Sequence, residues 1–390
     1  MGEAYIVAAA RTAGGKRNGK VSGWHPADLA GVVLDDLVAR AACDPALVED
    51  VIMGCVIQAG EQSQNIARGA VLASKLPQHI PGVSVDRQCG SSQQALHFAA
   101  ATVMAGVMDC VIAAGVESMT RAPMGLSSDV LAKNGYGKAK SPRQEAKYPD
   151  IVFSQFTGAE MMAEKHNFSR DQMDAFGFES QQKAIAATKA GRFDKEILAI
   201  DVVGPDGARA RHTVDEGIRF DVTLDGVKSV RLIKEGGRIT AATASQICDG
   251  ASGVMVVNER GLKALGVQPL ARIHSMTMTA GDPVIMLEEP LFATDRALKR
   301  AGMKIDDIDL YEVNEAFASV PTAWLKTTGA DPARLNVNGG AIALGHPLGG
   351  SGTKLMTTLL NALEQRNKRY GLQTMCEGGG MANVTIVERL

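Results

Sequence analysis

Short apolar runs alternate with helix-forming segments at both ends of the chain, and this pattern predicts strands separated by helices. The runs that we interpret as buried strands cover residues 51–56, 110–114, 251–258, 308–313 and 372–375. Helices are expected from about 92 to 104 and from about 351 to 363, each directly before one of these runs. Strands that alternate with helices are typical of mixed α/β layers with buried sheets.

The order of these elements repeats between the two ends of the chain. In the first half a strand leads through Cys89 into the helix at 92–104. In the second half a strand at 335–337 leads through a glycine-rich segment and His346 into the helix at 351–363. Because the element order and the positions of the reactive residues repeat together, we interpret the chain as a duplicated unit.

The middle of the chain is more polar and richer in loop-forming residues than the two ends. One helix is predicted there, because Ser169 and Gln172 form a capping box and Gly191 ends the helical pattern. We expect the run at 251–258 to return to the first half. The expected N-terminal half covers residues 1–119 together with 241–267. An inserted loop domain is expected at 120–240, and the C-terminal half at 268–390.

Length and charge narrow the class of protein. A chain of 390 residues exceeds one ordinary core, which agrees with a duplicated unit. A net charge of -2 with 45% hydrophobic residues is typical of a globular protein without the basic surface of a nucleic-acid binder. No apolar stretch reaches the roughly 18 residues of a membrane span. The first apolar run begins too early for a signal peptide, so we expect a cytoplasmic protein.

Six cysteines in a chain of this length do not form a disulfide framework, and we expect reduced thiols. None has the spacing of metal ligands, so no metal site is expected. Four of them are interpreted as small buried hydrophobic side chains, namely Cys43, Cys55, Cys110 and Cys248. The other two lie beside glycines and are candidates for chemistry.

Three reactive side chains, Cys89, His346 and Cys376, each lie beside a glycine-rich turn. Cys89 is placed at a strand-to-helix turn, where free helix N–H groups and the helix dipole favour a thiolate. Cys376 ends a strand and precedes three glycines, beginning with Gly378, whose N–H groups are suited to an oxyanion. A thiol nucleophile, a base and a second thiol form a complete set for acyl transfer.

Each candidate also has a purely structural interpretation. His346 can be a histidine packed in a turn, and the glycines after Cys376 can serve a tight turn alone. Asn314, at the end of a predicted strand, can be a helix cap. What favours chemistry is the cluster, because residues at the ends of equivalent strands in two halves converge on one pocket.

Six sequence blocks together match a known family. They are 60–68, 85–91, 115–119, 314–317 (Asn-Glu-Ala-Phe), 336–347 (ending in Gly-His-Pro) and 376–379 (Cys-Glu-Gly-Gly). In this order they resemble the thiolases, the 3-ketoacyl-CoA thiolases or acetyl-CoA acyltransferases, over essentially the full chain. The resemblance implies a duplicated five-layer α-β-α-β-α architecture with an inserted loop domain.

The resemblance also implies a residue-by-residue mechanism. Cys89 would take the acyl group of a 3-ketoacyl-CoA, and His346 would draw off its proton. Cys376 would protonate the acetyl-CoA enolate and then deprotonate CoA. Asn314 would hold a water that, with His346, faces the thioester oxygen. The N–H groups of Cys89 and Gly378 would face the oxygen of the acyl intermediate.

Binding and assembly are further implications of the resemblance. CoA would be a co-substrate, with no permanently bound cofactor. Ser245 would contact its pantetheine arm, Phe317 would pack beside that arm, and Arg219 would lie near the adenine. The family forms homodimers or homotetramers, and a tetramer contact would fall at about 120–150.

Some residues depart from the family pattern. Glu377 stands where an uncharged residue is common, and its carboxylate should disfavour the Cys376 thiolate or else point into the pocket and select substrate. Phe156 begins a block, Phe-Thr-Gly, where short-chain thiolases carry His-Met-Gly. We therefore expect a bulkier, branched or ring-derived 3-ketoacyl-CoA rather than acetoacetyl-CoA. Ser92 and Gly350 replace a common glycine and a common alanine.

Two other functions remain open from the sequence. A decarboxylating ketosynthase shares the duplicated architecture but needs a histidine where this chain has Cys376. An acyl-CoA or sterol binder without turnover would not need two ionisable thiols.

Overall fold

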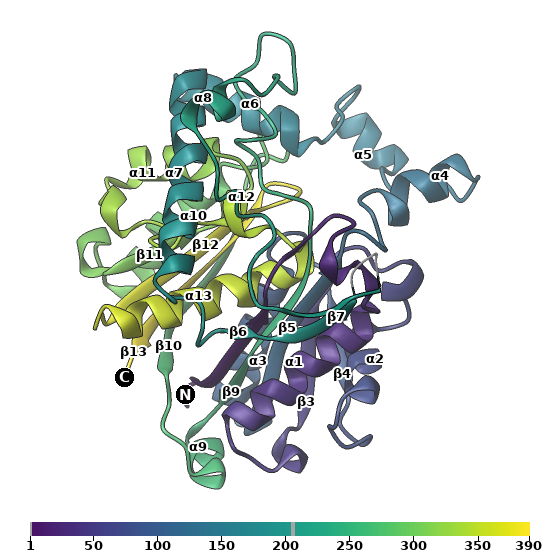
Figure 1. The fold of residues 1–390 in the computed structure, drawn as a ribbon, viewed down its shortest axis with the longest axis vertical. Coiled ribbons are helices and arrows are strands. Elements are labelled where there is room, and N and C mark those ends of the chain that lie inside the picture. Colours follow the sequence, from purple (N-terminus) through teal and green to yellow (C-terminus); the bar gives the residue numbers. More distant parts are fainter. Residues whose placement is uncertain (1, 204–206) are drawn as a thin grey trace.

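Two sheets share one edge in the computed structural model, which describes residues 2–203 and 207–390 (Figure 1). The contact joins β1 (Tyr5–Thr12) to β10 (Ala271–Ala280), antiparallel, with Tyr5 opposite Arg272 and Ile6 opposite Ala271. We call the strands on the β1 side the first sheet and those on the β10 side the second sheet. Together they form an eleven-stranded arrangement within the described chain.

The strand order of the first sheet repeats in the second. The first sheet runs β4 (Gly82–Val85), β3 (Asp50–Gly54), β5 (Cys110–Ser118), β9 (Cys248–Val257), β1. The second runs β11 (Leu310–Val313), β12 (Tyr370–Glu377), β13 (Met381–Arg389), β10. In the first sheet β3 pairs in parallel with β4 and β5, and β9 is antiparallel to both neighbours. In the second β11 and β12 are parallel and β13 is antiparallel to both neighbours. The duplication predicted from the element order is confirmed.

One predicted strand is reduced to single bridges. Leu335 pairs in parallel with Tyr311 and thereby occupies the place that β4 has in the first sheet. The next residue, Asn336, has a φ of 43° and cannot continue a strand. The side chain of Asn336 replaces the missing backbone hydrogen bonds to β11. Its Oδ1 accepts from the N–H of Val313 and its Nδ2 donates to the carbonyl of Val313, both at 2.9 Å.

Helices cover both sheets and fill the space between them, which gives five layers. The outer face of the first sheet carries α1 (Pro26–Arg40) and α2 (Ile66–Ala73). Between the sheets α3 (Ser91–Met104) packs against α13 (Ser351–Gln365). The outer face of the second sheet carries α10 (Glu289–Ala301), with α11 (Ser319–Thr328) against it. The predicted α-β-α-β-α architecture is confirmed, and α3 and α13 begin within a residue of their expected starts.

The segment between β5 and β9 is more helical than predicted. It contains α4 (Leu131–Lys133), α5 (Pro142–Lys147), α6 (Gln155–Lys165), α7 (Arg170–Lys189) and α8 (Leu224–Lys228), and the strands β6 (Ile197–Leu198), β7 (Ile200–Val203) and β8 (Arg209–His212). The capping box of Ser169 on α7 is present as predicted, and Gly191 follows the helix with a φ of 64°. The sequence pattern missed α6, whose buried face packs on α11.

This segment is tied to the rest of the fold. Strand β6 pairs in parallel with the end of β1, and α7 packs on α12 (Ala341–Leu344). Its exact boundaries, 120–240, stay a prediction. The remaining short elements are β2 (Gly15–Lys16), which pairs with β9, and α9 (Glu259–Leu265). As predicted, the strand after the inserted segment, β9, returns to the first sheet between β1 and β5.

Candidate active site

A constrained turn between β4 and α3 presents Cys89. Gln88, directly before it, has a φ of 50°, a conformation that side chains other than glycine rarely adopt. The turn is held because the carboxylate of Asp86 accepts from the N–H of Gln88 at 2.7 Å and the hydroxyl of Ser91 accepts from the N–H of Arg87 at 2.9 Å. The nucleophile candidate therefore lies on a rigid corner.

Cys89 is a neutral thiol in the resting site. Burial raises its pKa to about 12, and the nearby carboxyl of Glu377 adds to the rise. The backbone N–H groups of Cys89 and Gly378 lower the pKa of this thiol, which indicates that both N–H groups point toward the sulfur. The backbone N–H groups favour the thiolate as expected, but burial has the larger effect on the pKa of the thiol.

The imidazole of His346 is held in one tautomer by Ser351. The Ser351 hydroxyl donates to the carbonyl of Pro347 at 2.8 Å, so at 2.5 Å from His346 Nδ1 it must accept from that nitrogen. Nε2 is then left with a lone pair. Burial lowers the pKa of His346 to about 3, with the charge of Lys354 in the same direction. The imidazole is therefore a neutral base.

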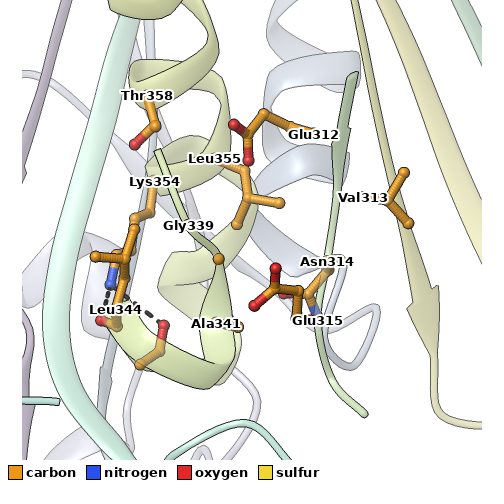
Figure 2. Close-up of a pocket in the computed structure, with 12 residues that line it drawn as sticks. Glu312, Val313, Asn314, Glu315, Gly339, Ala341, Leu344, Lys354, Leu355 and Thr358 are labelled. Atoms are coloured by element: carbon orange, nitrogen blue, oxygen red, sulfur yellow. Dashed lines mark hydrogen bonds between the residues drawn. The ribbon is translucent and has the colours of Figure 1, made fainter. Parts of the chain in front are cut away.

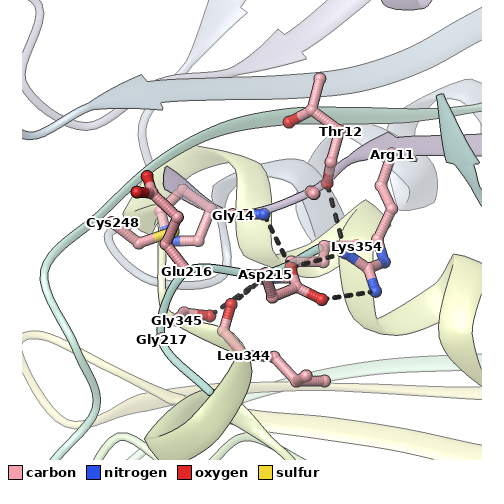
Figure 3. Close-up of polar contacts among 12 residues, drawn as sticks. Arg11, Thr12, Gly14, Asp215, Glu216, Gly217, Cys248, Leu344, Gly345 and Lys354 are labelled. Carbon is pink, nitrogen blue, oxygen red and sulfur yellow. Dashed lines mark hydrogen bonds and ion pairs between the residues drawn. The ribbon is translucent and has the colours of Figure 1, made fainter. Parts of the chain in front are cut away.

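A buried lysine one turn along α13 supports the His346 turn from behind. Lys354 Nζ donates to the carbonyls of Leu344 and Gly345 at 2.5 and 3.2 Å, as Figures 2 and 3 show. Its charge lies 3.8 Å from Asp215, which also forms a two-pronged ion pair with Arg11 at 2.8 and 3.1 Å (Figure 3). This network joins β1, the inserted segment and α13 directly behind the candidate base.

Asn314 reaches the candidate base from the end of β11. Its Nδ2 lies 3.4 Å from His346 Nε2, and its buried Oδ1 has no hydrogen-bond partner among the residues that the structure describes. The helix-cap interpretation of Asn314 is wrong, because the next helix, α11, begins only at Ser319. The neighbouring Glu315, drawn beside Asn314 in Figure 2, accepts from Ser180 at 2.6 Å and so ties α7 to this turn.

Cys376 is the penultimate residue of β12, and the glycines that follow Glu377 form the β12–β13 hairpin. Glu377 pairs with Met381 across a turn in which Gly379 and Gly380 have φ values of 87° and 77°. The Cys376 thiol is fully buried, and burial raises its pKa, followed by the charges of Cys89 and Glu377. The two thiols are thus electrostatic neighbours, and a charge on Glu377 acts against the Cys376 thiolate, the direction expected from the sequence.

An open cavity of about 860 Å³ reaches Cys89 from the side of the inserted segment. Its lining includes Cys89, Gly378 and Leu348 at the inner end and Phe153 and Phe156 from the inserted segment. His346, Asn314 and Cys376 do not line it and are buried. Of the three reactive candidates, Cys89 is therefore the one that a molecule in this cavity contacts.

Both parts of the chain match models of one enzyme family. Residues 4–260 match the thiolase N-terminal domain, and residues 267–389 match the thiolase C-terminal domain. The chain belongs to the thiolase family. The resemblance inferred from the six sequence blocks is confirmed, and with it an acyltransferase that uses CoA as a substrate.

Several proteins named as thiolases align with the whole chain. The steroid 3-ketoacyl-CoA thiolase FadA6 of Mycobacterium tuberculosis (strain ATCC 25618 / H37Rv) is 50% identical over 396 residues, which cover 100% of this chain and 95% of the relative. The 3-ketoacyl-CoA thiolase of Psychrobacter cryohalolentis is 42% identical, with 100% and 98% covered. That of Yersinia pestis (strain Pestoides F) is 40% identical, with 100% of both chains covered.

The residues expected to bind CoA in this thiolase lie around the segment at 241–247. The N–H of Ser245 donates to the carbonyl of Ala316 at 2.9 Å, which places Ser245 beside the turn of Phe317. Phe317 is buried, and its ring meets that of Phe156 edge to face at 5.5 Å. Arg219 is exposed and lines a small separate cavity together with Ala241 and Ala242.

Glu117 has a role in the thiolase site that its motif did not disclose. Its buried carboxylate accepts from the N–H groups of Val56, Ile57 and Gly349 at 2.9, 3.1 and 2.8 Å. It thereby joins a turn of the first sheet to the turn after His346. No pattern in the sequence indicates these partners, because they are backbone groups far away in the chain.

Within residues 2–203 and 207–390, no cluster of three or more histidines, cysteines or acidic residues has the arrangement of a metal site. Among the helices of the same residues, none has the length and apolar character needed to cross a membrane. All six cysteines are free, and Cys55, Cys110 and Cys248 are buried as expected, whereas Cys43 is only partly buried.

Proposed function

We propose that this thiolase cleaves a 3-ketoacyl-CoA with CoA to acetyl-CoA and a shortened acyl-CoA, through an acyl group on Cys89. The observation that carries the proposal is the tautomer of His346, whose unprotonated Nε2, 3.4 Å from Nδ2 of Asn314, lies in a site with two thiols. A neutral base and a neutral thiol supply the nucleophile without a permanent charge in a buried site.

In the first half-reaction the Cys89 proton passes to Nε2 of His346, and the sulfur attacks the 3-keto carbon. The bond between C2 and C3 then breaks, and its electron pair forms the enolate of acetyl-CoA. Cys376 donates its thiol proton to C2 and becomes a thiolate. Asn314 and His346 stabilise the enolate oxygen, for which the unpartnered Oδ1 of Asn314 can hold a water.

In the second half-reaction Cys376 takes the thiol proton of CoA, and the CoA sulfur attacks the carbonyl of the acyl group. The oxyanion lies against the N–H groups of Cys89 and Gly378, which already act on the Cys89 sulfur in the resting site. Cys89 leaves as a thiolate and regains its proton from the imidazolium of His346. Run in reverse, the same steps make a Claisen condensation.

The preferred acyl group is proposed to be bulky or ring-derived. The cavity of about 860 Å³ lies near the upper end of the usual range for small-molecule sites, roughly 300–1,000 Å³. Phe156 forms part of its wall, where short-chain thiolases carry a histidine. The relative that is 50% identical carries a steroid substrate in its name.

CoA is proposed to enter along Ser245 and Phe317 toward Cys89, with Arg219 near its nucleotide. Ser245 and Phe317 lie on adjoining segments that pair through Ala244. No permanently bound cofactor takes part in the proposed steps. We further propose a cytoplasmic homodimer or homotetramer, with the exposed apolar side chains of segment 120–150, such as Tyr136, as a tetramer contact.

A panel of 3-ketoacyl-CoA esters tests the proposed function. The panel contains acetoacetyl-CoA, a straight medium-chain ester, a branched ester and a ring-bearing ester, with acetyl-CoA release in the presence of CoA as the readout. We expect the bulky esters to have the highest kcat/KM and Cys89→Ala to be inactive on all of them. No cleavage of any ester would refute the thiolytic function, and preference for acetoacetyl-CoA would refute only the substrate class.

A further inference from the structure

Glu377 is a buried acid that the proposed steps do not use. It is the last residue of β12, its side chain is fully buried, and within the described chain neither carboxyl oxygen has a hydrogen-bond partner. A carboxylate without hydrogen bonds is strongly disfavoured in such a place. The resting side chain is therefore a neutral carboxylic acid, and burial raises the pKa of Glu377 to about 8.

The carboxyl group of Glu377 lies against the backbone beside the nucleophile. A Cβ placed on Gly90 would come within 1.9 Å of its Oε1, so the acid fills the space next to the residue that follows Cys89. Successive side chains of a strand point to opposite faces, so Glu377 and Cys376 leave β12 in opposite directions. Glu377 does not line the substrate cavity, and the expectation that it selects substrate from within the pocket is not met.

A charge at this position acts on both thiols. A Glu377 carboxylate raises the pKa of Cys89, second only to burial, and it also raises the pKa of Cys376. We propose that Glu377 is a positioning residue that acts through Cys89: as a neutral acid it permits the Cys89 thiolate, and as a carboxylate it suppresses it. This inference rests on the proposed role of Cys89 as the nucleophile.

The charged and polar groups around Glu377 do not keep it permanently ionised, so its protonation state depends on pH. The guanidinium of Arg87, on the turn before α3, and the backbone N–H of Asn383, on β13, which lies near the carboxyl without hydrogen-bond geometry, lower the pKa of Glu377 but do not offset burial. On α3, burial keeps His97 neutral, and the pKa of this imidazole is lowered to about 3. On β5, Glu117 also raises the pKa of Cys89, but less than Glu377 does.

The sign of the effect follows from these groups. Below about pH 8 Glu377 is neutral and adds no charge beside the nucleophile. Above that pH it releases its proton to solvent, and the remaining carboxylate opposes ionisation of Cys89. Glu377→Gln keeps the shape of the side chain and removes the ionisation, so only the behaviour above about pH 8 should change.

The test measures alkylation of Cys89 by iodoacetamide from about pH 6 to about pH 10, read by mass spectrometry of the Cys89 peptide. Far below the pKa of a thiol, each unit by which that pKa falls raises the thiolate fraction about tenfold. We expect Glu377→Gln to react several-fold faster than the wild-type protein in the upper half of the range and at a similar rate in the lower half. Superimposable profiles would overturn the proposal.

A matched control and a second readout keep the test independent of folding and turnover. Glu312→Gln alters another buried acid with a raised pKa, on the neighbouring strand β11, and should leave the alkylation profile unchanged. Infrared spectra of the wild-type protein should lose one protonated-carboxyl band between about pH 7 and about pH 9, and Glu377→Gln should lack this change. Absence of the band at the lower pH would also overturn the proposal. Neither readout needs thiolase activity, so failure of the substrate panel and failure of this inference are distinguishable.

Discussion

At the scale of single residues, Cys89 and His346 are both neutral before substrate arrives. Burial raises the pKa of the thiol to about 12 and lowers the pKa of the imidazole to about 3. An ion pair between them is therefore not the resting state, and in the proposed mechanism the proton moves to Nε2 only as the sulfur attacks. The reaction then depends on the tautomer that Ser351 imposes on the imidazole.

Replacing Ser351 by alanine tests that dependence. Ser351→Ala removes the acceptor for Nδ1–H, so the proton can reside on either nitrogen and the ring can turn. General-base catalysis is worth about 10²–10⁴ in rate, and we expect kcat to fall about 10²-fold. KM should change little, because Ser351 does not line the substrate cavity. The rate of Cys89 acylation in a rapid-quench experiment measures the effect, and an unchanged rate would show that the tautomer is set elsewhere.

The role of a residue could be predicted from the sequence only where its immediate neighbours in the chain indicate that role. Cys89, His346 and Cys376 stood out because each is a reactive side chain beside glycines. The net rise in the pKa of Cys89 could not be predicted, since the burial of its sulfur and the place of Glu377 depend on the folded chain.

At the scale of elements, α13 carries both the partner and the support of the candidate base. Ser351 is the first residue of the helix, and its hydroxyl contacts the imidazole of His346. Lys354 follows one turn later, and its ammonium group donates to the carbonyl of Leu344 in the turn before His346. Lys354 is almost fully buried, with Asp215 and two carbonyls as its surroundings. A buried charge in such a network stabilises the fold only while its partners remain.

Lys354→Met is expected to destabilise the protein by about 3 kcal/mol, because Asp215 loses a neighbouring charge and two carbonyls lose their donor. Urea unfolding measures the change as a lower midpoint with an unchanged slope. Lys299→Met is the control: this exposed lysine on α10 pairs with Asp295, a contact worth about 0.3–0.5 kcal/mol. Equal effects of the two substitutions would contradict a structural role for the network.

Helices and strands could be predicted where the hydrophobic periodicity agrees with the turn and capping residues at the ends of the segment. Helices α3 and α13 were predicted because a glycine-rich turn with a reactive side chain precedes each helix and an apolar strand follows it. Helix α6 was missed because its buried face is completed by α11, more than a hundred and fifty residues later in the chain. The strand expected at 335–337 was too short to form, since Asn336 replaces its ladder with side-chain bonds.

At the scale of the whole molecule, duplication brings chemistry from two halves to one place. Cys89 comes from the end of β4 in the first sheet, and Cys376 from the end of β12 in the second. His346 comes from the turn before α13, which packs beside α3 between the sheets. Glu117 bonds across to Gly349 and fixes the two halves against each other at this point. The sequence predicted this convergence from repeated element order, but the contact that fixes it depends on the folded chain.

The central claim is that this convergence forms one acyl-transfer site with unequal thiols, and trapping the acyl group tests it most directly. A cleavable 3-ketoacyl-CoA from the substrate panel is mixed with Cys376→Ser and with Cys89→Ala, and the quenched proteins are digested for mass spectrometry. The account predicts that the acyl mass accumulates on the Cys89 peptide of Cys376→Ser, because its resolution by CoA is slowed, and that Cys89→Ala carries no acyl group. An acyl group retained by Cys89→Ala, or found on Cys376 in the wild-type protein, would contradict it.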